Sequence, residues 1–338
     1  MEKKTKAIAL FSGGLDSVLA AKLMLEQGIE VKAVTYTTVF CDRSSKEPLC
    51  DIASRAAAQL DVPIEIIDVS EEYLEVIKKP RYGYGSGMNP CVDCRIFFLI
   101  KAKEYMEKSG AAFVFTGEVA GQRPMSQKKR TMGVIERESG LTGLLIRPLS
   151  AKLFAPSVPE MTGMVDRNGF FSISGRSRKP QILLAEKLGI KDYSCGRGGC
   201  LLTDKGFAER LKDLLKHKPD FDIRDVNLLK YGRHFRISPE VKLVVSRREL
   251  ENYYIASLRK ENDIVFFSEN PLGPVSVLRG VSGGHFINEA ASITARYALG
   301  RSGEGEAKIR YFEHPREESF KHIMAKPFDD DRLNLWRV

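Results

Sequence analysis

Hydrophobic and polar residues follow two periods along the first 120 residues. Short apolar runs of strand length alternate with longer segments whose apolar residues recur every three or four positions. The runs predict strands at 7–10, 31–40, 63–69 and 111–118, and the longer segments predict helices at 17–28, 49–60, 71–79 and 94–110. Strands that alternate with helices of this length predict a parallel sheet with helices on both faces, which is a doubly wound α/β domain.

Beyond residue 120 the pattern loosens and then changes. One further strand is expected within 144–150, and amphipathic helices are expected at 178–190 and 206–217. From about residue 220, short apolar runs and two helical segments indicate a small α+β domain. We therefore predict a first domain of residues 1–217 and a second of residues 218–338.

Charge is concentrated in one part of the chain. The 338 residues carry a net charge of +9, and residues 121–200 hold 14 Lys and Arg against 6 Asp and Glu, a balance of +8. Such a concentration favours a polyanionic partner such as nucleic acid, with a solvated basic surface as the alternative. No apolar run approaches the roughly 18 residues that span a bilayer, so no membrane association is expected. With no signal peptide in the N-terminal sequence, we expect a cytoplasmic protein.

The segment FSGGLDS, residues 11–17, follows the first predicted strand and precedes the first predicted helix. Glycines let the backbone approach a phosphate, and N–H groups at a helix N-terminus attract an anion. Asp16 would repel a bare phosphate, so we expect it to hold a cation bound to that phosphate. The segment lacks the Lys-Ser/Thr end of a Walker A loop and the spacing of a dinucleotide fold.

SGGLDS in this position resembles the PP-loop of the ATP pyrophosphatase superfamily. The resemblance implies a HUP fold, like that of the adenine nucleotide alpha hydrolases, which binds ATP and Mg²⁺. It also implies an enzyme that adenylylates an oxygen of its substrate and releases pyrophosphate, after which a nucleophile displaces AMP. The residues expected to contact the nucleotide are Phe11, Ser12, Gly13, Gly14, Asp16, Ser17, Gly117 and Arg123.

Three groups of cysteines carry the second chemical signal. Cys91 and Cys94 form a CxxC at the start of a predicted helix, where the helix N-terminus favours thiolates. Cys195 and Cys200 lie together near the end of the first domain. Thiolates at such spacings bind an iron–sulfur cluster or zinc, or form a redox disulfide. Cys41 follows a strand end, from which it can face the same site.

The segments 117–127, 144–153, 174–190 and 198–204 resemble a group of ThiI-like tRNA thiolases. That resemblance implies a [4Fe–4S] cluster held by Cys91, Cys94 and Cys200, with one open iron that delivers sulfide to the adenylated base. Whether Cys195 or Cys200 is the third ligand stays open. In those relatives the chain ends in an RNA-binding domain like that of NFACT ribosome-quality-control proteins, and residues 233–255 resemble it.

Further residues are candidates for acid–base chemistry and RNA contact. Glu118 follows a strand end and is expected to share the cation with Asp16 or to accept a proton, a capping role being the alternative. Arg123 is expected to contact the triphosphate. Basic runs at 128–130 and 176–179 are expected to contact the RNA backbone. In the second domain the basic and aromatic residues suited to RNA are Arg233, His234, Arg236, Arg247, Arg248, Tyr231, Tyr253 and Tyr254.

The sequence therefore predicts an ATP-dependent tRNA thiouridine synthase in which Asp16, Glu118, Cys91, Cys94 and Cys200 act on the reaction. Its expected partners are tRNA and a sulfur source, either sulfide or a cysteine desulfurase, and a homodimer is an open alternative. Three rivals remain: a persulfide relay without a cluster, an amidotransferase-like PP-loop enzyme, and an RNA-binding factor without activity. The modified uridine, and the choice between carbon 2 and carbon 4, are not determined.

Overall fold

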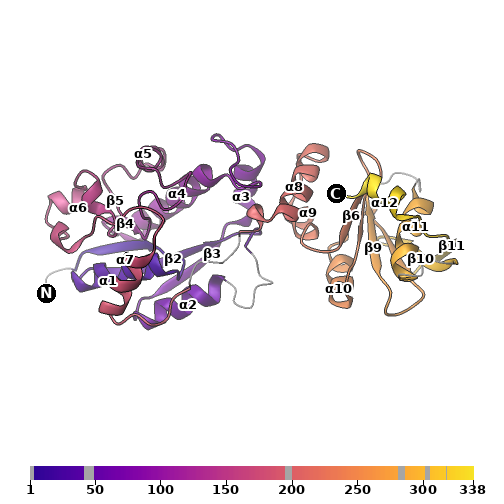
Figure 1. Ribbon diagram of the computed structural model, residues 1–338, viewed down its shortest axis with the longest axis horizontal. Coiled ribbons are helices and arrows are strands. Elements are labelled where there is room, and N and C mark those ends of the chain that lie inside the picture. Colours follow the sequence, from indigo (N-terminus) through magenta and orange to yellow (C-terminus); the bar gives the residue numbers. More distant parts are fainter. Residues whose placement is uncertain (1–3, 42–48, 195–199, 281–285, 301–304, 317) are drawn as a thin grey trace. The chain divides into compact units, whose positions relative to one another are not determined.

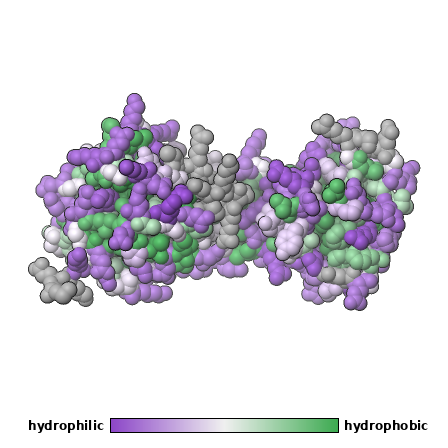
Figure 2. All heavy atoms as spheres, turned by 90° about the horizontal axis from the view of Figure 1, so that it is seen from below, coloured by the Kyte–Doolittle hydropathy of each residue, from purple (hydrophilic) through white to green (hydrophobic). Residues whose placement is uncertain are grey.

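The computed structural model describes residues 4–41, 49–194, 200–280, 286–300, 305–316 and 318–338. The chain forms two compact units that divide between Asp204 and Lys205 (Figure 1). No helix within the described ranges is long and apolar enough to cross a membrane. On the face drawn in Figure 2, both units present mostly hydrophilic side chains, with apolar ones among them.

The first unit is built on a parallel sheet. Within the described residues its strand order is β3-β2-β1-β4-β5, and every neighbouring pair is parallel. The strands are β1 (Lys6–Leu10), β2 (Glu30–Thr37), β3 (Ile64–Asp68), β4 (Phe113–Thr116) and β5 (Leu145–Ile146). This sheet confirms the predicted parallel α/β class.

Helices cover both faces of this sheet. One hydrophobic core joins the sheet to α1 (Leu15–Glu26), α2 (Leu49–Gln59) and α7 (Lys179–Lys187). The opposite core joins it to α4 (Cys91–Ser109) and α5 (Lys129–Glu138), with α3 (Ser70–Lys78) beside α4. The remaining helical segments of this unit are α6 (Val158–Met161), η1 (Ala151–Leu153), η2 (Arg167–Gly169) and η3 (Leu201–Thr203).

The strand order reverses direction at β1. The chain proceeds from β1 to β2 and β3 on one side, and later places β4 and β5 on the other. The carboxyl ends of β1 and β4 lie side by side, with Leu10 paired to Thr116. Loops that leave adjacent strands in opposite directions open a crevice between them, which is where open α/β sheets bind ligands. The segment 11–17 and the segment that begins at Gly117 therefore meet at one edge.

The second unit contains an antiparallel sheet with helices on both faces. Across its described residues the strand order is β11-β10-β8-β9-β7-β6. One core joins the sheet to α11 (Ile287–Ala298) and α12 (Asp330–Trp336), and the other joins it to α9 (Ile223–Leu228) and α10 (Glu249–Ser257). The strands are β6 (Arg233–Arg236), β7 (Lys242–Val245), β8 (Ile264–Ser268), β9 (Val275–Arg279), β10 (Ala307–Glu313) and β11 (Lys321–Ala325).

The division between the units lies before α8 (Lys205–His217), whereas the sequence analysis placed it after residue 217. The reason is an ionic cluster that the sequence does not display. Asp213 on α8 receives hydrogen bonds from Arg236 on β6, at 2.7 and 3.0 Å, and from Lys242 on β7, at 2.7 Å. These bonds attach α8 to the second sheet.

Several elements were not predicted, among them α5, β11 and α12. α5 is rich in charged residues and buries only Met132 and Ile135, so its apolar period is weak. β11 alternates exposed and partly buried positions at a sheet edge, and α12 buries only Leu333. In each of these elements, tertiary packing decides the conformation that the local pattern leaves undetermined.

Candidate active site

The loop after β1 requires glycine where it passes α2. Gly13 has a φ of +69°, and a Cβ there would lie 2.7 Å from the carbonyl oxygen of Ile52. Gly14 follows in an extended conformation and begins α1 as its N-cap. The loop therefore turns sharply beneath the helix N-terminus, where the backbone dipoles favour an anion.

Two serines hold this loop in shape. The Ser17 hydroxyl donates to the Gly14 carbonyl at 2.8 Å, and the Ser12 N–H donates to the Ser17 hydroxyl at 3.4 Å. Ser194 also lies against the loop, because its carbonyl accepts from the Leu15 N–H at 3.4 Å. A segment close to the last cysteine therefore borders the phosphate-binding loop.

Gly117, the first residue after β4, touches the beginning of α1. A Cβ at this position would lie 2.4 Å from the Asp16 carbonyl oxygen and 2.5 Å from the Ser17 nitrogen. Only glycine permits the two strand ends to approach this closely. The contact brings together the two loops from which the sequence analysis drew its nucleotide-binding residues.

A pocket of about 200 Å³ opens between these loops. Its lining includes all the predicted nucleotide-contacting residues except the two loop glycines, whose backbone forms the adjacent turn. The lining residues are Leu10, Phe11, Ser12, Asp16, Ser17, Thr35, Tyr36, Leu49, Arg95, Phe98, Thr116, Gly117, Glu118, Gln122, Arg123 and Gln127. The structure thus gathers most of the predicted set at one crevice.

Asp16 keeps one oxygen free of hydrogen bonds. Its Oδ2 accepts from the Gln122 amide at 2.9 Å, whereas its buried Oδ1 has no partner among the described residues. Gln181 on α7 in turn donates to Gln122 at 3.4 Å. Burial raises the pKa of Asp16, while Gln122 and the positive charge of Arg178 oppose the rise. A buried carboxylate oxygen without a donor fits the predicted Mg²⁺ ligand.

Glu118 lies between two guanidinium groups rather than beside Asp16. Its Oε1 pairs with Arg95 Nε at 3.1 Å, and its Oε2 accepts from Arg147 Nε at 3.3 Å. Burial opposes ionisation, yet Arg95 and Arg147 together lower the pKa of Glu118 below its usual value. The carboxylate is therefore ionised and committed to two arginines, which favours a role in positioning Arg95 over the predicted role as cation ligand or base.

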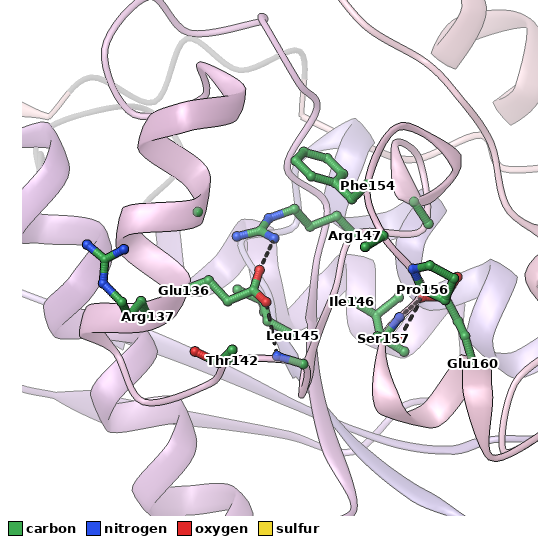
Figure 3. Close-up of a pocket in the computed structure, with 14 residues that line it drawn as sticks. Glu136, Arg137, Thr142, Leu145, Ile146, Arg147, Phe154, Pro156, Ser157 and Glu160 are labelled. Carbon is green, nitrogen blue, oxygen red and sulfur yellow. Dashed lines mark hydrogen bonds and ion pairs between the residues drawn. The ribbon is translucent and has the colours of Figure 1, made fainter.

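Arg147 connects this ion pair to a second cavity of about 500 Å³. Figure 3 shows its guanidinium extending over Glu136, to which it donates at 2.7 Å, with Phe154 beside it. Glu136 also accepts from the Gly143 N–H at 3.1 Å. Arg147 and Glu136 thus have hydrogen-bond partners within the protein. The cavity shares no lining residue with the nucleotide crevice, which Arg147 contacts through Glu118.

Cys41, Cys91 and Cys94 all lie within electrostatic range of Cys200. Cys94, Cys200 and Cys91 all act on the hydroxyl of buried Tyr73, whose pKa is raised first by burial and then by these thiols. Cys94, Cys41 and Cys91 act in the same way on the Cys200 thiol. The structure therefore brings together the CxxC and Cys200, as the sequence predicted, and adds Cys41. Cys195 lies outside the described residues.

Backbone contacts fix the segment around Cys200. Leu201 N–H donates to the Phe40 carbonyl at 3.1 Å, and Met88 N–H donates to the Leu202 carbonyl at 2.8 Å. The segment therefore lies between the end of β2 and the loop that leads into α4. This placement explains how cysteines more than a hundred residues apart share one region.

Burial keeps these thiols protonated. It raises the pKa of Cys200 to about 12, and it raises the pKa of Cys91 and Cys94 as well. At Cys91 and Cys94, the positive charges of Arg95 and Arg123 partly oppose the rise. Both arginines also line the nucleotide pocket. The sulfur region and the nucleotide crevice are therefore coupled through two shared cations.

A [4Fe–4S] cluster needs cysteine thiolates that converge on one cube. Cys91, Cys94 and Cys200 supply the right donor type, and Arg95 and Arg123 supply compensating charge. In the part of the chain that the structure describes, however, no three His, Cys, Asp or Glu side chains form a group that could hold a metal ion. The described thiols thus do not fit a ready-made ligand set, for iron–sulfur or for zinc.

The predicted RNA-contacting residues divide into surface and structural groups. Lys128, Lys129, Arg130 and Arg176 are exposed, as expected of phosphate contacts, whereas Arg178 is half-buried and lies within range of Asp16. In the second unit Arg247, Arg248, Tyr253 and Tyr254 are exposed. His234 and Arg236 are structural instead, because His234 is buried against the Tyr231 carbonyl at 2.8 Å and Arg236 binds Asp213.

Several residues of the site were missed by the sequence analysis. Arg95, Arg147, Tyr73 and Gln181 lie in predicted helices or beside predicted strands, where their spacing gave no chemical signal. Only Arg95 had a local clue, because it follows the CxxC directly. Arg95 and its partner Glu118 are 23 residues apart, and Gln181 and its partner Gln122 are 59 apart, so only the fold brings each pair together.

Comparison with known proteins gives an independent view of both units. Residues 5–138 match the family described as tRNA methyl transferase HUP domain. Residues 232–337 match the family described as NFACT protein RNA binding domain. The first match covers the sheet and crevice described above, and the second covers most of the antiparallel unit.

Curated relatives match part of the chain and, in one case, nearly all of it. The tRNA-specific 2-thiouridylase MnmA 1 of Caldanaerobacter subterraneus subsp. tengcongensis is 25% identical over 98% of this chain and 90% of its own length. The MnmA of Syntrophotalea carbinolica is 33% identical over 35% of this chain, and this chain spans 36% of that relative.

Among solved structures, a 4-thiouridine synthetase bound to RNA and ATP is 21% identical, with a TM-score of 0.35, over 55% of this chain and 52% of that one. The family matches and the parallel sheet confirm the sequence-based recognition of both domains. The chain consists of a PP-loop domain of the HUP type followed by an RNA-binding domain of the NFACT type.

Proposed function

We propose that this chain is an ATP-dependent tRNA thiouridine synthase. One observation carries the proposal: Arg95 and Arg123 line the nucleotide crevice and also act on the CxxC thiols. An activated substrate in the crevice would therefore lie beside sulfur. The names of the curated relatives and the RNA-binding second domain support tRNA as the substrate.

The activation step uses the crevice. The loop 11–17 and the N-terminus of α1 would bind the phosphates of ATP, and Mg²⁺ at Asp16 would neutralise part of their charge. A uracil carbonyl oxygen attacks the α-phosphorus, pyrophosphate leaves, and the base carries AMP on that oxygen. Exposed Arg123 lies on the pocket wall, where it can stabilise the charge on pyrophosphate.

The geometry favours a persulfide relay for the sulfur step, because the described thiols form no metal-holding group. A donor first places a sulfane sulfur on Cys200. The terminal sulfur attacks the carbon that bears the adenylylated oxygen, AMP leaves, and the base is joined to Cys200 through a disulfide. A second thiol then attacks the Cys200 sulfur and releases the thiolated base. A cysteine desulfurase is the class of donor that this route requires.

The [4Fe–4S] route remains the second candidate. It is favoured by the mutual interaction of Cys91, Cys94 and Cys200, which are the cysteines that the family resemblance assigns to the cluster. An amidotransferase-like reaction would leave these thiols without a role. Iron content separates the two sulfur routes, because a cluster contributes about four irons per chain with broad absorption near 400 nm.

The test is reconstitution with the full chain, purified without oxygen. Unmodified tRNA, ATP, Mg²⁺ and a desulfurase with cysteine are combined, and digested nucleosides are identified by mass spectrometry. We expect ATP-dependent 2- or 4-thiouridine, lost in Cys200→Ser and retained in Cys50→Ser. The absence of any thiolated nucleoside, with both the desulfurase and free sulfide as donors, would contradict the proposal. Activity from a colourless, iron-free protein supports the relay, and activity that requires bound iron supports the cluster.

A further inference from the structure

Cys41 and Cys200 face each other across two extended segments. They form an isolated antiparallel bridge between the segment that follows β2 and the residue that precedes η3. The hydrogen bond that defines the bridge joins neighbours of the pair, from Leu201 N–H to the Phe40 carbonyl at 3.1 Å. Cys41 and Cys200 are therefore a non-hydrogen-bonded pair.

This type of pair brings side chains closest together. Residues in a non-hydrogen-bonded antiparallel pair have Cα atoms about 4.5 Å apart and project their side chains to the same side. A disulfide needs Cα atoms roughly 4.4 to 6.8 Å apart. A bridge of this type therefore places the backbones of Cys41 and Cys200 in the range of separations that a disulfide needs.

Both thiols are also accessible and oriented. Each residue is partly exposed. The Cys41 sulfur accepts from the Thr38 N–H at 3.4 Å and lies 3.8 Å from the Thr38 hydroxyl. The contact with the Thr38 N–H holds the Cys41 sulfur in one orientation.

We propose that Cys41 is the resolving thiol of the sulfur-transfer step, and that its product is a Cys41–Cys200 disulfide. This inference rests on the proposed thiolation by persulfide relay. It assigns this role to the cysteine that the backbone holds opposite Cys200.

The step balances in atoms and electrons. After AMP has left, the base is bound through its new sulfur to the Cys200 sulfur. The Cys41 thiolate attacks Cys200 Sγ, a sulfur–sulfur bond forms between the cysteines, and the bond to the base breaks, leaving its electron pair on the thiouridine sulfur. The sulfane sulfur is reduced by two electrons while the two cysteines are oxidised. A dithiol reductant then reopens the disulfide for the next cycle.

The first experiment tests the pair without RNA or ATP. The reduced full chain is equilibrated with glutathione disulfide, free thiols are blocked with N-ethylmaleimide, and disulfide-linked peptides are mapped by mass spectrometry. We expect Cys41–Cys200 as the main internal disulfide, lost in Cys41→Ser and unchanged in Cys50→Ser. Cys50 is the matched control, because it is also partly exposed and its thiol donates to the neighbouring Asp51 carboxylate at 3.8 Å. A Cys200 that pairs with Cys91 or Cys94, or stays reduced, overturns the inference.

The second experiment follows the reaction itself. With persulfide-loaded enzyme and no reductant, we expect Cys41→Ser to accumulate a tRNA adduct that dithiothreitol releases, and its single-turnover release of free thiolated tRNA to fall at least about tenfold. Cys41→Ala serves as the second variant, and an unchanged melting temperature shows that each is folded. A variant that turns over at the wild-type rate overturns the role. If the Cys41–Cys200 disulfide forms in the first experiment but no RNA is thiolated, only the proposed function fails. If RNA is thiolated with Cys91 or Cys94 as the resolving thiol, only this inference fails.

Discussion

Buried side-chain oxygens without a hydrogen-bond partner indicate where this protein can bind a ligand. Asp16 Oδ1, Gln127 Oε1 and Gln181 Oε1 have no hydrogen-bond partner among the described residues, and Asp16 and Gln127 line the nucleotide crevice. A buried polar atom without a partner costs roughly 1–3 kcal/mol, so such atoms concentrate where a ligand or ion satisfies them. By contrast, both Glu118 oxygens pair with arginines, Oε1 with Arg95 at 3.1 Å and Oε2 with Arg147 at 3.3 Å, which fits a structural role.

The Asp16→Asn substitution separates the cost of burying the carboxylate from its contribution to cation binding. Burial raises the pKa of Asp16, so the ionised carboxylate destabilises the free protein at neutral pH, and a neutral amide removes that cost. We expect the variant to melt at the same or a higher temperature without nucleotide. We also expect it to lose most of the added stability that ATP with Mg²⁺ confers on the wild type, because the cation loses its carboxylate.

Differential scanning fluorimetry over a range of MgATP concentrations measures both effects. Asp61→Asn is the control, because Asp61 is exposed and its left-handed φ of 55° is one that asparagine tolerates. An Asp16→Asn protein that MgATP stabilises as strongly as the wild type would show that Asp16 holds no cation.

At the scale of elements, α8 shows how an ionic cluster assigns a helix to a domain. Its apolar face is typical of any amphipathic helix and does not select between the two sheets. The selection comes from Asp213, whose carboxylate receives Arg236 and Lys242 from two adjacent strands. The same unit contains a second cluster, in which Asp225 pairs with Lys218, Lys260 and Arg279.

Asp213→Asn should loosen α8 in a pH-dependent manner. Burial opposes ionisation, yet Arg236 and Lys242 lower the pKa of Asp213 from 3.8 to about 2. A lowered carboxyl pKa means that the ion pairs stabilise the fold fully above pH 4 and are lost as the pH falls toward 2. We expect the variant to lose about 3 kcal/mol at pH 7, since two buried cations lose their partner, and to show a flatter stability profile between pH 4 and pH 2.

Hydrogen exchange of peptides from 205–217 and 233–245, followed by mass spectrometry, reports this loss locally. Asp220→Asn, an exposed change near the same helix, is the control. Equal protection of α8 in the wild type and in Asp213→Asn would assign the helix's attachment to its apolar face alone.

For the whole molecule, the two units divide the work of the proposed reaction. The first unit contains the crevice and the described thiols, and the second carries exposed Arg247, Arg248, Tyr253 and Tyr254. Tyr254 stacks on Tyr231 with ring centroids 4.9 Å apart, which leaves an aromatic surface beside basic groups. Such surfaces bind unpaired bases by stacking and the backbone by charge.

Removal of residues 205–338 should therefore weaken RNA binding and leave nucleotide binding intact. We expect tRNA affinity to fall at least about tenfold, and the dependence of affinity on salt to become shallower, because fewer phosphates are neutralised. Filter binding at several salt concentrations measures both, and stabilisation by MgATP is the control for folding. The Arg247→Ala/Arg248→Ala double variant of the full chain should show a smaller change in the same direction. A truncated chain with wild-type affinity and salt dependence would place RNA recognition in the first unit.

Local patterns in the amino-acid sequence sufficed for the parallel sheet and for the glycine turn that follows β1. Apolar periodicity and glycine spacing act over a few residues, and each imposes its conformation wherever the segment lies. They did not suffice for α5 or for the helix that joins the second unit, because both depend on contacts with distant residues.

The fold alone decided which side chains meet. The pairing of Glu118 with Arg95 and Arg147, the amide chain from Gln181 to Asp16, and the opposition of Cys41 and Cys200 all join segments distant in the sequence. Spacing along the chain carries no information about such pairs, since strand order and loop closure set the distance between them. The sequence thus indicated which residues are candidates for the chemistry, whereas tertiary packing determined which side chain each of them contacts.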